Sequence, residues 1–286
     1  DTFRQTYGLD EKMVYSPSQI TNAEEDFDIL VVDEAHRLRQ HKNLTQYGQH
    51  DKNNAKMGLG QDGTELDWIL RRSKHCILLY DQDQTVKPTD VPAEKFQALL
   101  SGTDSLHSFD LVTQVRCILG GQKYPDYIKA IFSQNPPSGR TDFPSYDLRL
   151  YDDVSKMVKY INRGLYDIEI DGHRYIWNVK YDGWLTSPNS INEIGCIHTI
   201  QGFDLNYAGV IIGNELRYDP IAERLYIDPS EYYDQKGKAG VAEADLLQYI
   251  LHIYQVLCTR GMRGTYIYAC DKNLREYLEK FIPKAE

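Results

Sequence analysis

The sequence predicts an α/β fold with mainly parallel sheets, because strand-like and helix-like segments alternate along the chain. Four short apolar runs end in polar clusters, as strands buried on both faces do. These runs are residues 27–32, 76–80, 207–213 and 265–270. The helical stretches between and after them are residues 64–73, 153–165, 244–258 and 271–282. Parallel sheets bind ligands at the carboxyl ends of their strands, so the polar clusters lie where chemistry is expected.

The composition is that of a globular protein. Of the 286 residues, 41% are hydrophobic and 26% are charged, which excludes collagen-like, low-complexity and wholly disordered chains. No run approaches the roughly 18–20 apolar residues of a membrane helix, and the polar start lacks the apolar stretch of a signal peptide. We therefore expect no membrane partner and a cytoplasmic location.

Charge and cysteine content narrow the function further. The net charge of −10 argues against a protein that coats nucleic acid by bulk electrostatics, although it leaves room for a local basic groove. The cysteines are Cys76, Cys117, Cys196, Cys258 and Cys270. Their number is odd and none forms a C-x-x-C pair, so neither a disulfide framework nor a zinc ribbon is indicated. We expect reduced thiols.

The length suits two domains. We place the boundary near residues 105–110, where a polar stretch separates a helix from an apolar run, which gives domains 1–108 and 109–286. Residues 37–63 are polar, rich in Asn, Gln and Gly and without period, and they predict a long surface excursion between two strands. Residues 133–147 contain prolines and predict a surface loop in the second domain.

An acidic tetrad, Asp33-Glu34-Ala35-His36, follows the first predicted strand directly. In nucleotide hydrolases an Asp at such a strand end holds the Mg²⁺ shell, and the next Glu polarises the attacking water. An acidic strand end that only begins a turn is the alternative, but the strand before the tetrad favours the nucleotide interpretation. Gln84 ends the polar cluster after the next strand, where a Gln can report on a γ-phosphate. For Gln84 alone, a polar turn is the simpler alternative.

Three further motifs lie in the second half of the chain. Arg116 follows a short apolar run, His198 opens the segment HTIQGFD, and Arg260 lies in TRGMRG between a helix and a strand. Arg116 and Arg260 are candidates for arginine fingers, which place guanidinium charge on a transferring phosphoryl group. The alternatives are a surface ion pair for either arginine and a structural role for His198. The order of the motifs therefore carries the argument.

In this order the motifs resemble motifs II to VI of superfamily-one helicases. The phrases DILVVDEAHRLR, TELDWILRRSKHCILLYDQDQTVKP, IHTIQGFDLNYAGVIIG and LCTRGMRGTYIYACD are more closely similar to the bacterial Schlafen group-3-like DNA/RNA helicase family. The resemblance spans nearly the whole chain and implies two RecA-like domains of the P-loop NTPase architecture, the first of them incomplete. It also implies ATP and Mg²⁺ as cofactors, and DNA or RNA in single-stranded form as the partner.

Residue by residue, the resemblance implies one set of catalytic residues and a second set that couples nucleotide binding to nucleic-acid binding. The catalytic residues would be Asp33, Glu34, Gln84, Arg116 and Arg260, with the Mg²⁺ held by Asp33. The residues that would couple the nucleotide to the nucleic acid are His36, His198, Gln201, Gly202, Asp204 and Thr259. Asp204 stands where many such helicases carry Glu.

The phosphate-binding loop G-x-x-x-x-G-K-[ST] is absent from the sequence. Residues 58–64 have its glycine spacing but lack the Lys, and only 32 residues precede Asp33. We therefore expect the carboxyl-terminal bulk of an ATP-dependent helicase or translocase, with ATP hydrolysed at the interface of two domains, and inactive as this chain alone. Two alternatives stay open: a non-catalytic RecA-like module that binds nucleic acid or protein, and a metal-dependent nuclease built on Asp33, Glu34 and His36.

Overall fold

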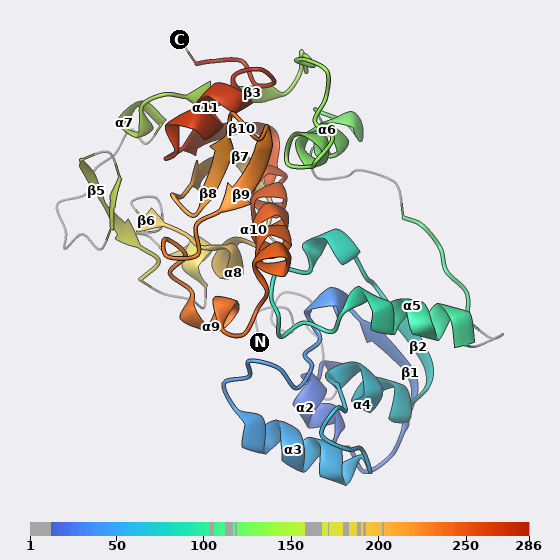
Figure 1. The fold of residues 1–286 in the computed structure, drawn as a ribbon. Helices are drawn as coiled ribbons and strands as arrows, with labels where there is room; N and C mark the ends of the chain where they lie inside the picture. Colours follow the sequence, from blue (N-terminus) through green and yellow to red (C-terminus); the bar gives the residue numbers. More distant parts are fainter. Residues whose placement is uncertain are drawn as a thin grey trace. The chain divides into compact units, whose positions relative to one another are not determined.

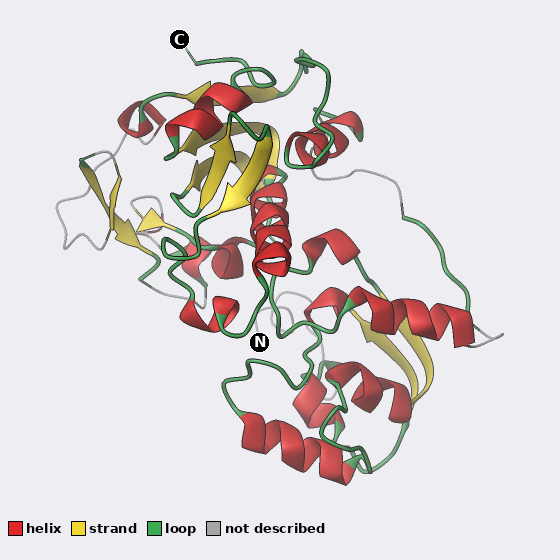
Figure 2. Cartoon of the chain, in the orientation of Figure 1, coloured by secondary structure: helices red, strands yellow, loops and turns green. Residues whose placement is uncertain are grey.

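The fold was obtained as a computed structural model (Figure 1). It describes residues 13–102, 106–111, 117, 119–157, 168–170, 172–179, 183–187, 190, 193–201 and 203–285. The chain divides into two compact units, Asp1–Ser108 and Phe109–Glu286. Helices and strands mix throughout both units, and the mixed α/β class predicted from the sequence is confirmed (Figure 2). Within the described ranges, no helix combines the length and the apolar character needed to cross a membrane.

Unit 1 is built around a parallel pair of strands. Its elements in chain order are α2 (Pro17–Ile20), β1 (Phe27–Val32), η2 (Ala35–Arg37), α3 (Tyr47–Lys56), α4 (Glu65–Arg71), β2 (Ser73–Leu78), η3 (Gln82–Gln84) and α5 (Ala93–Gly102). β1 pairs with β2 in parallel, with Val32 opposite Leu78. A capping box begins α4, in which Thr64 and Asp67 satisfy each other's backbone amides. The apolar runs and the helical stretch 64–73 thus predict the presence of β1, β2 and α4, although β2 begins at Ser73 and ends at Leu78 rather than spanning residues 76–80.

One face of the β1–β2 sheet carries the core of unit 1. Leu30, Val32 and Leu78 on that face pack with the buried Leu66 and Ile69 of α4. The side chains exposed on the opposite face are Ile29, Val31, Ile77 and Leu79, with exposed fractions of 61%, 63%, 52% and 42%. The prediction that these strands are buried on both faces is therefore wrong. The described helices that join this core pack against one face of the sheet, which leaves the other apolar face open.

Residues 37–63 are not the aperiodic excursion that the sequence predicts, because helix α3 forms in their middle. The inward face of α3 is polar, and both His50 and Asn54 are buried. Asn54 Oδ1 accepts the indole N–H of Trp68 at 2.6 Å, and Asn54 Nδ2 donates to the Gly63 backbone oxygen at 3.1 Å. A helix that is buried through hydrogen bonds has no apolar period, so hydrophobic periodicity does not detect it.

Unit 2 is built around a three-stranded parallel sheet with the order β3–β10–β7. Its elements in chain order are α6 (Lys123–Ile131), β3 (Asp147–Tyr151), α7 (Val154–Met157), β4 (Ile168–Ile170), β5 (His173–Trp177), η4 (Trp184–Thr186), β6 (Glu193–Ile194), α8 (Ile197–Ile200), β7 (Leu205–Ile212), β8 (Leu216–Asp219), β9 (Arg224–Ile227), α9 (Gln235–Lys238), α10 (Glu243–Cys258), β10 (Gly261–Ala269) and α11 (Lys272–Leu278). Side chains of α6, α10 and α11 join those of this sheet in the large core of the unit.

The sequence predicts most of these elements. The stretch 244–258 is confirmed as helix α10, whereas of the stretch 271–282 only Lys272–Leu278 forms helix α11 and residues 279–282 form turns and a bend. The surface loop predicted before β3 lacks helix and strand until β3 begins at Asp147. Of the predicted helix 153–165, α7 covers the start, and residues 158–165 lie outside the described residues.

A second cluster lies on the other face of the β3–β10–β7 sheet. Val154, Tyr175 and Tyr268 form it, and Tyr268 alternates with the core residue Ile267 along β10, so the two side chains point to opposite faces. Smaller pairings accompany the main sheet: β4 with β5 and β8 with β9 are antiparallel, and β6 runs parallel to β5. The sheets are therefore mainly but not wholly parallel.

Candidate functional site

The acidic tetrad forms a tight turn at the end of β1. The exposed Asp33 accepts the backbone N–H of Glu34 on its Oδ1 at 3.0 Å. The backbone N–H of Ala35 donates to the Leu79 oxygen at 2.8 Å, and the Leu79 N–H donates to the Val32 oxygen at 2.9 Å. These bonds tie the ends of β1 and β2 together. The turn after β1 and the polar cluster after β2 therefore leave the sheet at the same edge.

Glu34 has a left-handed backbone conformation, with φ of 52° and ψ of 45°. Such a conformation is uncommon for a residue with a Cβ atom and is enriched at functional sites, because the surrounding structure must hold it in place. The carboxylate of Glu34 lies against His36, with Glu34 Oε2 2.9 Å from His36 Nε2, although the two atoms lack hydrogen-bond geometry. The His36 side chain is only 3% exposed, whereas that of Glu34 is 35% exposed. A buried imidazole thus lies beside a carboxylate that solvent and ligands can reach.

Gln84 ends the short helix η3 after β2. Its Nε2 donates to Asp81 Oδ2 at 2.8 Å, and Asp81 Oδ1 accepts the backbone N–H of Asp83 at 3.0 Å. The following segment is fastened by Asp90, whose Oδ2 accepts the Val86 backbone N–H at 3.2 Å. Burial raises the pKa of Asp90 to about 6, although hydrogen bonds from the backbone N–H groups of Val86 and Lys87 favour its charged form. Because the Nε2 of Gln84 donates to Asp81, the Gln84 amide is engaged within its own loop.

The carboxylates of Asp33 and Glu34 at the end of β1 have the chemistry of a Mg²⁺ site that is shared with a substrate. Mg²⁺ usually binds one or two protein carboxylates together with substrate phosphates and water. Asp33 offers an exposed carboxylate at the strand end, next to Glu34, and so fits that arrangement. In the part of the chain that the structure describes, no group of three or more His, Cys, Asp and Glu side chains is arranged to hold a metal ion.

In unit 2, the HTIQGFD segment forms the short helix α8 and the turn into β7. The buried Thr199 donates from its hydroxyl to Asn178 Oδ1 at 2.8 Å and accepts the Cys196 backbone N–H at 3.2 Å. Gln201 is 4% exposed, and both polar atoms of its amide lack a hydrogen-bond partner among the described residues. Asp204 is exposed just before β7, His198 lies in α8, and Gly202 falls outside the described residues.

The TRGMRG segment joins α10 to β10. The Thr259 hydroxyl donates to the backbone oxygens of Gln255 and Val256, both at 3.0 Å. Arg260 is 2% exposed, and its Nε donates to the Val256 oxygen at 3.0 Å. The carboxyl end of a helix carries partial negative charge, which stabilises a cation there. The structure thus encloses the Arg260 guanidinium inside unit 2, while Arg116 lies outside the described residues.

Sequence reasoning missed three residues that shape these segments. Asp81 and Asp90 hold the loop that carries Gln84. Gly264 lets β10 approach β3 closely, because a Cβ atom there would lie 2.5 Å from the backbone oxygen of Asp147. The available signals are the first acidic residue of the DQDQ cluster at residues 81–84, the acidic residue Asp90 that follows this cluster, and the second glycine of TRGMRG. The same region joins two motifs, since the Leu205 N–H at the start of β7 donates to the Arg260 oxygen at 3.0 Å.

The α/β fold and the order of these motifs define a helicase-like class of protein. The family described as "Schlafen group 3, DNA/RNA helicase domain" matches residues 3–165 and 162–271, and this chain belongs to that family. It is also 30% identical over 188 residues to an uncharacterized protein of Saccharomyces cerevisiae, YPL245W. That match covers 54% of this chain and 41% of the yeast protein, so the chain spans less than half the length of this relative. No solved structure matches the chain.

Proposed function

We propose that this chain is part of an ATP-dependent DNA or RNA helicase or translocase of the superfamily-one type. The observation that carries the proposal is the common sheet edge in unit 1, where Asp33 and Glu34 follow β1 and Gln84 follows the neighbouring β2. The helicase description of the family supports a nucleic-acid partner, and we infer that this partner is single-stranded.

Each group has a distinct role in this proposal. Bound Mg²⁺ would neutralise charge on the β- and γ-phosphates of ATP. Asp33 would hold the ion, and Glu34, whose carboxylate lies beside His36, would accept the proton of the attacking water. Gln84 would exchange its bond to Asp81 for one to the γ-phosphate and so report the loss of that group.

Unit 2 would supply the charge stabilisation and the coupling. Arg116 and Arg260 would place positive charge on the transferring phosphoryl group, an effect worth roughly 10³-fold or more in rate. His198, Gln201, Gly202, Asp204 and Thr259 would pass the nucleotide state to the nucleic-acid strand. The buried Gln201 amide without a partner among the described residues supports such a role, because a buried polar group normally finds one.

The site also needs a phosphate cradle that this sequence does not contain. A glycine-rich loop normally surrounds the phosphates with backbone N–H groups and supplies a Lys. Without that loop, the chain on its own should bind ATP weakly and not hydrolyse it.

Substitution of Glu34 tests the proposal in the complete protein that carries this chain. Glu34→Gln keeps size and hydrogen bonding but loses the base, so the variant should bind ATP and stall before hydrolysis. Asp33→Asn should instead weaken Mg²⁺-dependent nucleotide binding. The measurement is the affinity for a labelled single strand with and without ATP, with the exposed Glu25→Gln as the matched control. Responses to ATP that are the same in wild type and both site variants would refute the motor function.

A non-catalytic binding module is the second candidate. Two observations favour it: Gln84 bonds to Asp81, and the Arg260 guanidinium is enclosed at the end of α10. Both groups are engaged within their own units rather than directed at solvent. In such a module, nucleic-acid affinity would not depend on ATP, so the same titrations separate the two candidates.

A further inference from the structure

The second face of the β3–β10–β7 sheet is covered at one end and open at the other. At the carboxyl half of that face, Tyr268 is buried against Val154 and Tyr175. At the amino half, Tyr207 is 50% exposed and Gly209 is exposed as well. Parallel sheets are normally covered on both faces. The amino half is therefore a surface that a ligand can reach, and none of its residues is among the groups assigned to ATP above.

Tyr207 belongs to a row of aromatic rings that crosses the sheet. Its ring stacks on that of Tyr266, with the centroids 5.8 Å apart and the planes within 10° of parallel. Tyr266 contacts Tyr151 of β3 edge to face at 5.8 Å, and it lies two residues before Tyr268 on β10, hence on the same face. Gly264 makes room for the row, because a Cβ atom there would lie 3.0 Å from Tyr207 Cδ1. The exposed ring of Tyr207 thus rests on a packed support.

Hydrogen bonds fix the ring on which Tyr207 stacks. The Tyr266 hydroxyl donates to Asp147 Oδ2 at 2.8 Å, and Arg149 Nε donates to Asp147 Oδ1 at 2.7 Å. Burial and the neighbouring Asp147 raise the pKa of Tyr266 to about 12, so its hydroxyl stays a donor at neutral pH. An aromatic ligand that stacks on Tyr207 therefore meets a preorganised surface and has little of the protein to order.

A groove of about 550 Å³ lies at the same amino end of the sheet, and Tyr207 lines it together with loop residues 141–146. Its size is typical of a ligand site. Its charged lining residues are Arg149, Arg263, Asp142 and Asp147. Asp147 is paired with Arg149, whereas the exposed Arg263 guanidinium makes no hydrogen bond or ion pair with the residues that the structure describes. The groove thus combines an exposed aromatic ring with a cation that is accessible to an anion.

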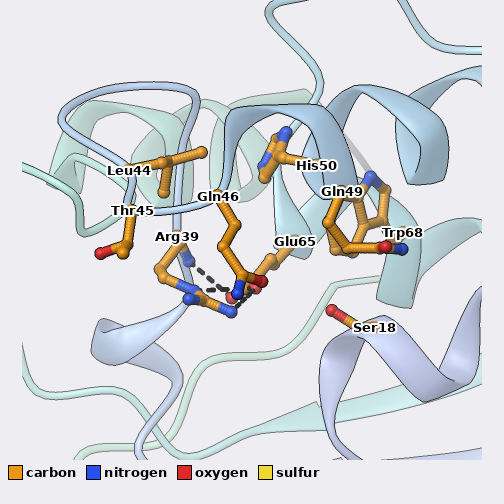
Figure 3. Close-up of a pocket in the computed structure, with 9 residues that line it drawn as sticks. All are labelled: Ser18, Arg39, Leu44, Thr45, Gln46, Gln49, His50, Glu65 and Trp68. Atoms are coloured by element: carbon orange, nitrogen blue, oxygen red, sulfur yellow. Dashed lines mark hydrogen bonds and ion pairs between the residues drawn. The ribbon is translucent and has the colours of Figure 1, made fainter.

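A smaller pocket of about 300 Å³, beside α3 of unit 1, lacks this combination (Figure 3). Its guanidinium is committed to a neighbour, since Arg39 Nε and Nη2 donate to Glu65 Oε1 at 3.0 and 2.7 Å. The Arg39 backbone N–H donates to Glu65 Oε2 at 2.9 Å. The aromatic rings that line this pocket, His50 and Trp68, are both buried. An exposed ring and an accessible cation therefore occur together in the unit 2 groove and not beside α3.

We propose that the groove in unit 2 binds one nucleotide of a single-stranded nucleic acid, with its base stacked on Tyr207 and the adjoining phosphate beside Arg263. The choice of a nucleic-acid partner rests on the proposed function, which the helicase description of the family supports. Proteins that bind single strands combine aromatic side chains on which bases stack with cations that follow the backbone. The two arginines and two aspartates of the groove leave it without net charge, so stacking supplies most of the affinity.

The test measures the affinity of this chain for fluorescently labelled strands of ten dT or ten U residues, by anisotropy and without ATP. Tyr207→Ala removes the stacking surface and should weaken binding about fivefold to 150-fold, the range for replacing a stacking aromatic residue with alanine. Tyr207→Phe keeps the ring and should stay within about twofold of wild type. The matched control Tyr233→Ala should also stay within about twofold, because Tyr233 is 87% exposed and does not line the groove.

Arg263 has a separate signature in the salt dependence of binding. For single strands, the slope of log affinity against log salt concentration is about −0.7 for each phosphate contact. Arg263→Gln should therefore make the slope shallower by about 0.7, whereas Arg263→Lys keeps the charge and should keep the slope. Tyr207→Ala should leave the slope unchanged, because it removes no charge.

Three results would overturn the proposal. The first is the absence of strand binding by this chain, and the second is an equal affinity of Tyr207→Ala and Tyr233→Ala. The third is displacement of the labelled strand by thymidine monophosphate as effectively as by an unlabelled decamer at equal nucleotide concentration, which would assign the groove to a free nucleotide. NMR spectra of Tyr207→Ala that match wild type away from the sheet exclude loss of folding as the cause of weaker binding.

The outcomes for the groove differ from those for the helicase proposal. Strand binding that Tyr207→Ala leaves unchanged would overturn the groove and leave the helicase proposal intact. Conversely, the complete protein could bind a strand through Tyr207 with an affinity that does not respond to ATP. That result would support the groove and refute the motor function.

Discussion

Asp90→Asn should stabilise unit 1 at neutral pH and leave its stability nearly unchanged near pH 4. Asp90 is 6% exposed, and its Oδ2 accepts the backbone N–H groups of Val86 and Lys87 at 3.2 and 3.0 Å. These bonds fasten the segment that follows Gln84, so the carboxylate also matters for the position of a candidate catalytic group. Asn keeps an oxygen that can accept both bonds but carries no charge, and the substitution therefore isolates the cost of burying that charge.

The magnitude follows from two pKa values. The pKa of Asp90 is about 6 in the folded chain, against about 3.9 for an Asp in an unfolded chain. Below about pH 4 the carboxyl is protonated in both states and costs nothing. Between about pH 4 and 6 only the unfolded chain releases the proton, so wild-type stability falls, and above about pH 6 the penalty is constant. The difference of about two pKa units corresponds to at most about 3 kcal/mol.

Urea unfolding between pH 4 and pH 8 measures this difference. The NMR signal of the Trp68 indole N–H reports on unit 1 alone, because Trp68 is buried there and donates to Asn54. Asp62→Asn removes an exposed carboxylate of the same unit and should give no comparable gain. If Asp90→Asn is no more stable than wild type at pH 8, or if its advantage is the same at pH 4 and pH 8, burial of the Asp90 charge is not the cause.

Two substitutions test the TRGMRG segment. Gly264→Ala should destabilise unit 2 by about 1–3 kcal/mol, because its Cβ would lie 2.5 Å from the Asp147 backbone oxygen, whereas Gly209→Ala, with its nearest atom at 4.0 Å, should cost less than about 1 kcal/mol. Urea unfolding measures both, and equal stabilities would disprove the close approach. In the complete protein, Arg260→Lys should cut nucleic-acid-stimulated ATPase by roughly 10³-fold with ATP affinity within about tenfold, and the exposed Arg263→Lys should change it far less. Small, equal effects of both would show that Arg260 acts only at the end of α10.

The strands and their ends could be predicted because local sequence dominates there. Each apolar run is short, rich in branched residues and followed at once by polar residues, so little else competes with a strand. This pattern is enough to locate β1, β7, β10 and the Asp33-Glu34 pair. It gives no information on burial of the second face. Ile29 and Val31 have the pattern of a strand covered on both sides, yet they are exposed because coverage depends on which other elements reach the sheet.

The side-chain partners of the candidate site could not be predicted, because they depend on packing. The left-handed backbone of Glu34 depends on the bonds that tie the turn to β2, since no local preference of Glu favours it. The bond of Gln84 to Asp81 is local, but a polar cluster offers several such pairings of similar energy. Burial of Arg260 depends on how α10 ends against the strand that follows. Motif order identifies these residues without showing which way they point.

Helix α3 and its pocket show why polar burial escapes a search for apolar periods. His50, Asn53 and Asn54 have the i, i+3, i+4 spacing that predicts one buried helix face when the residues are apolar. Their burial depends on Trp68, 14 residues beyond Asn54, and on the Arg39–Glu65 pair, which spans 26 residues. The same spacing of polar residues, in a segment without an apolar period, therefore also predicts a buried helix face. A face of that kind must satisfy its donors within the fold, as Asn54 does by donating to the Gly63 backbone oxygen.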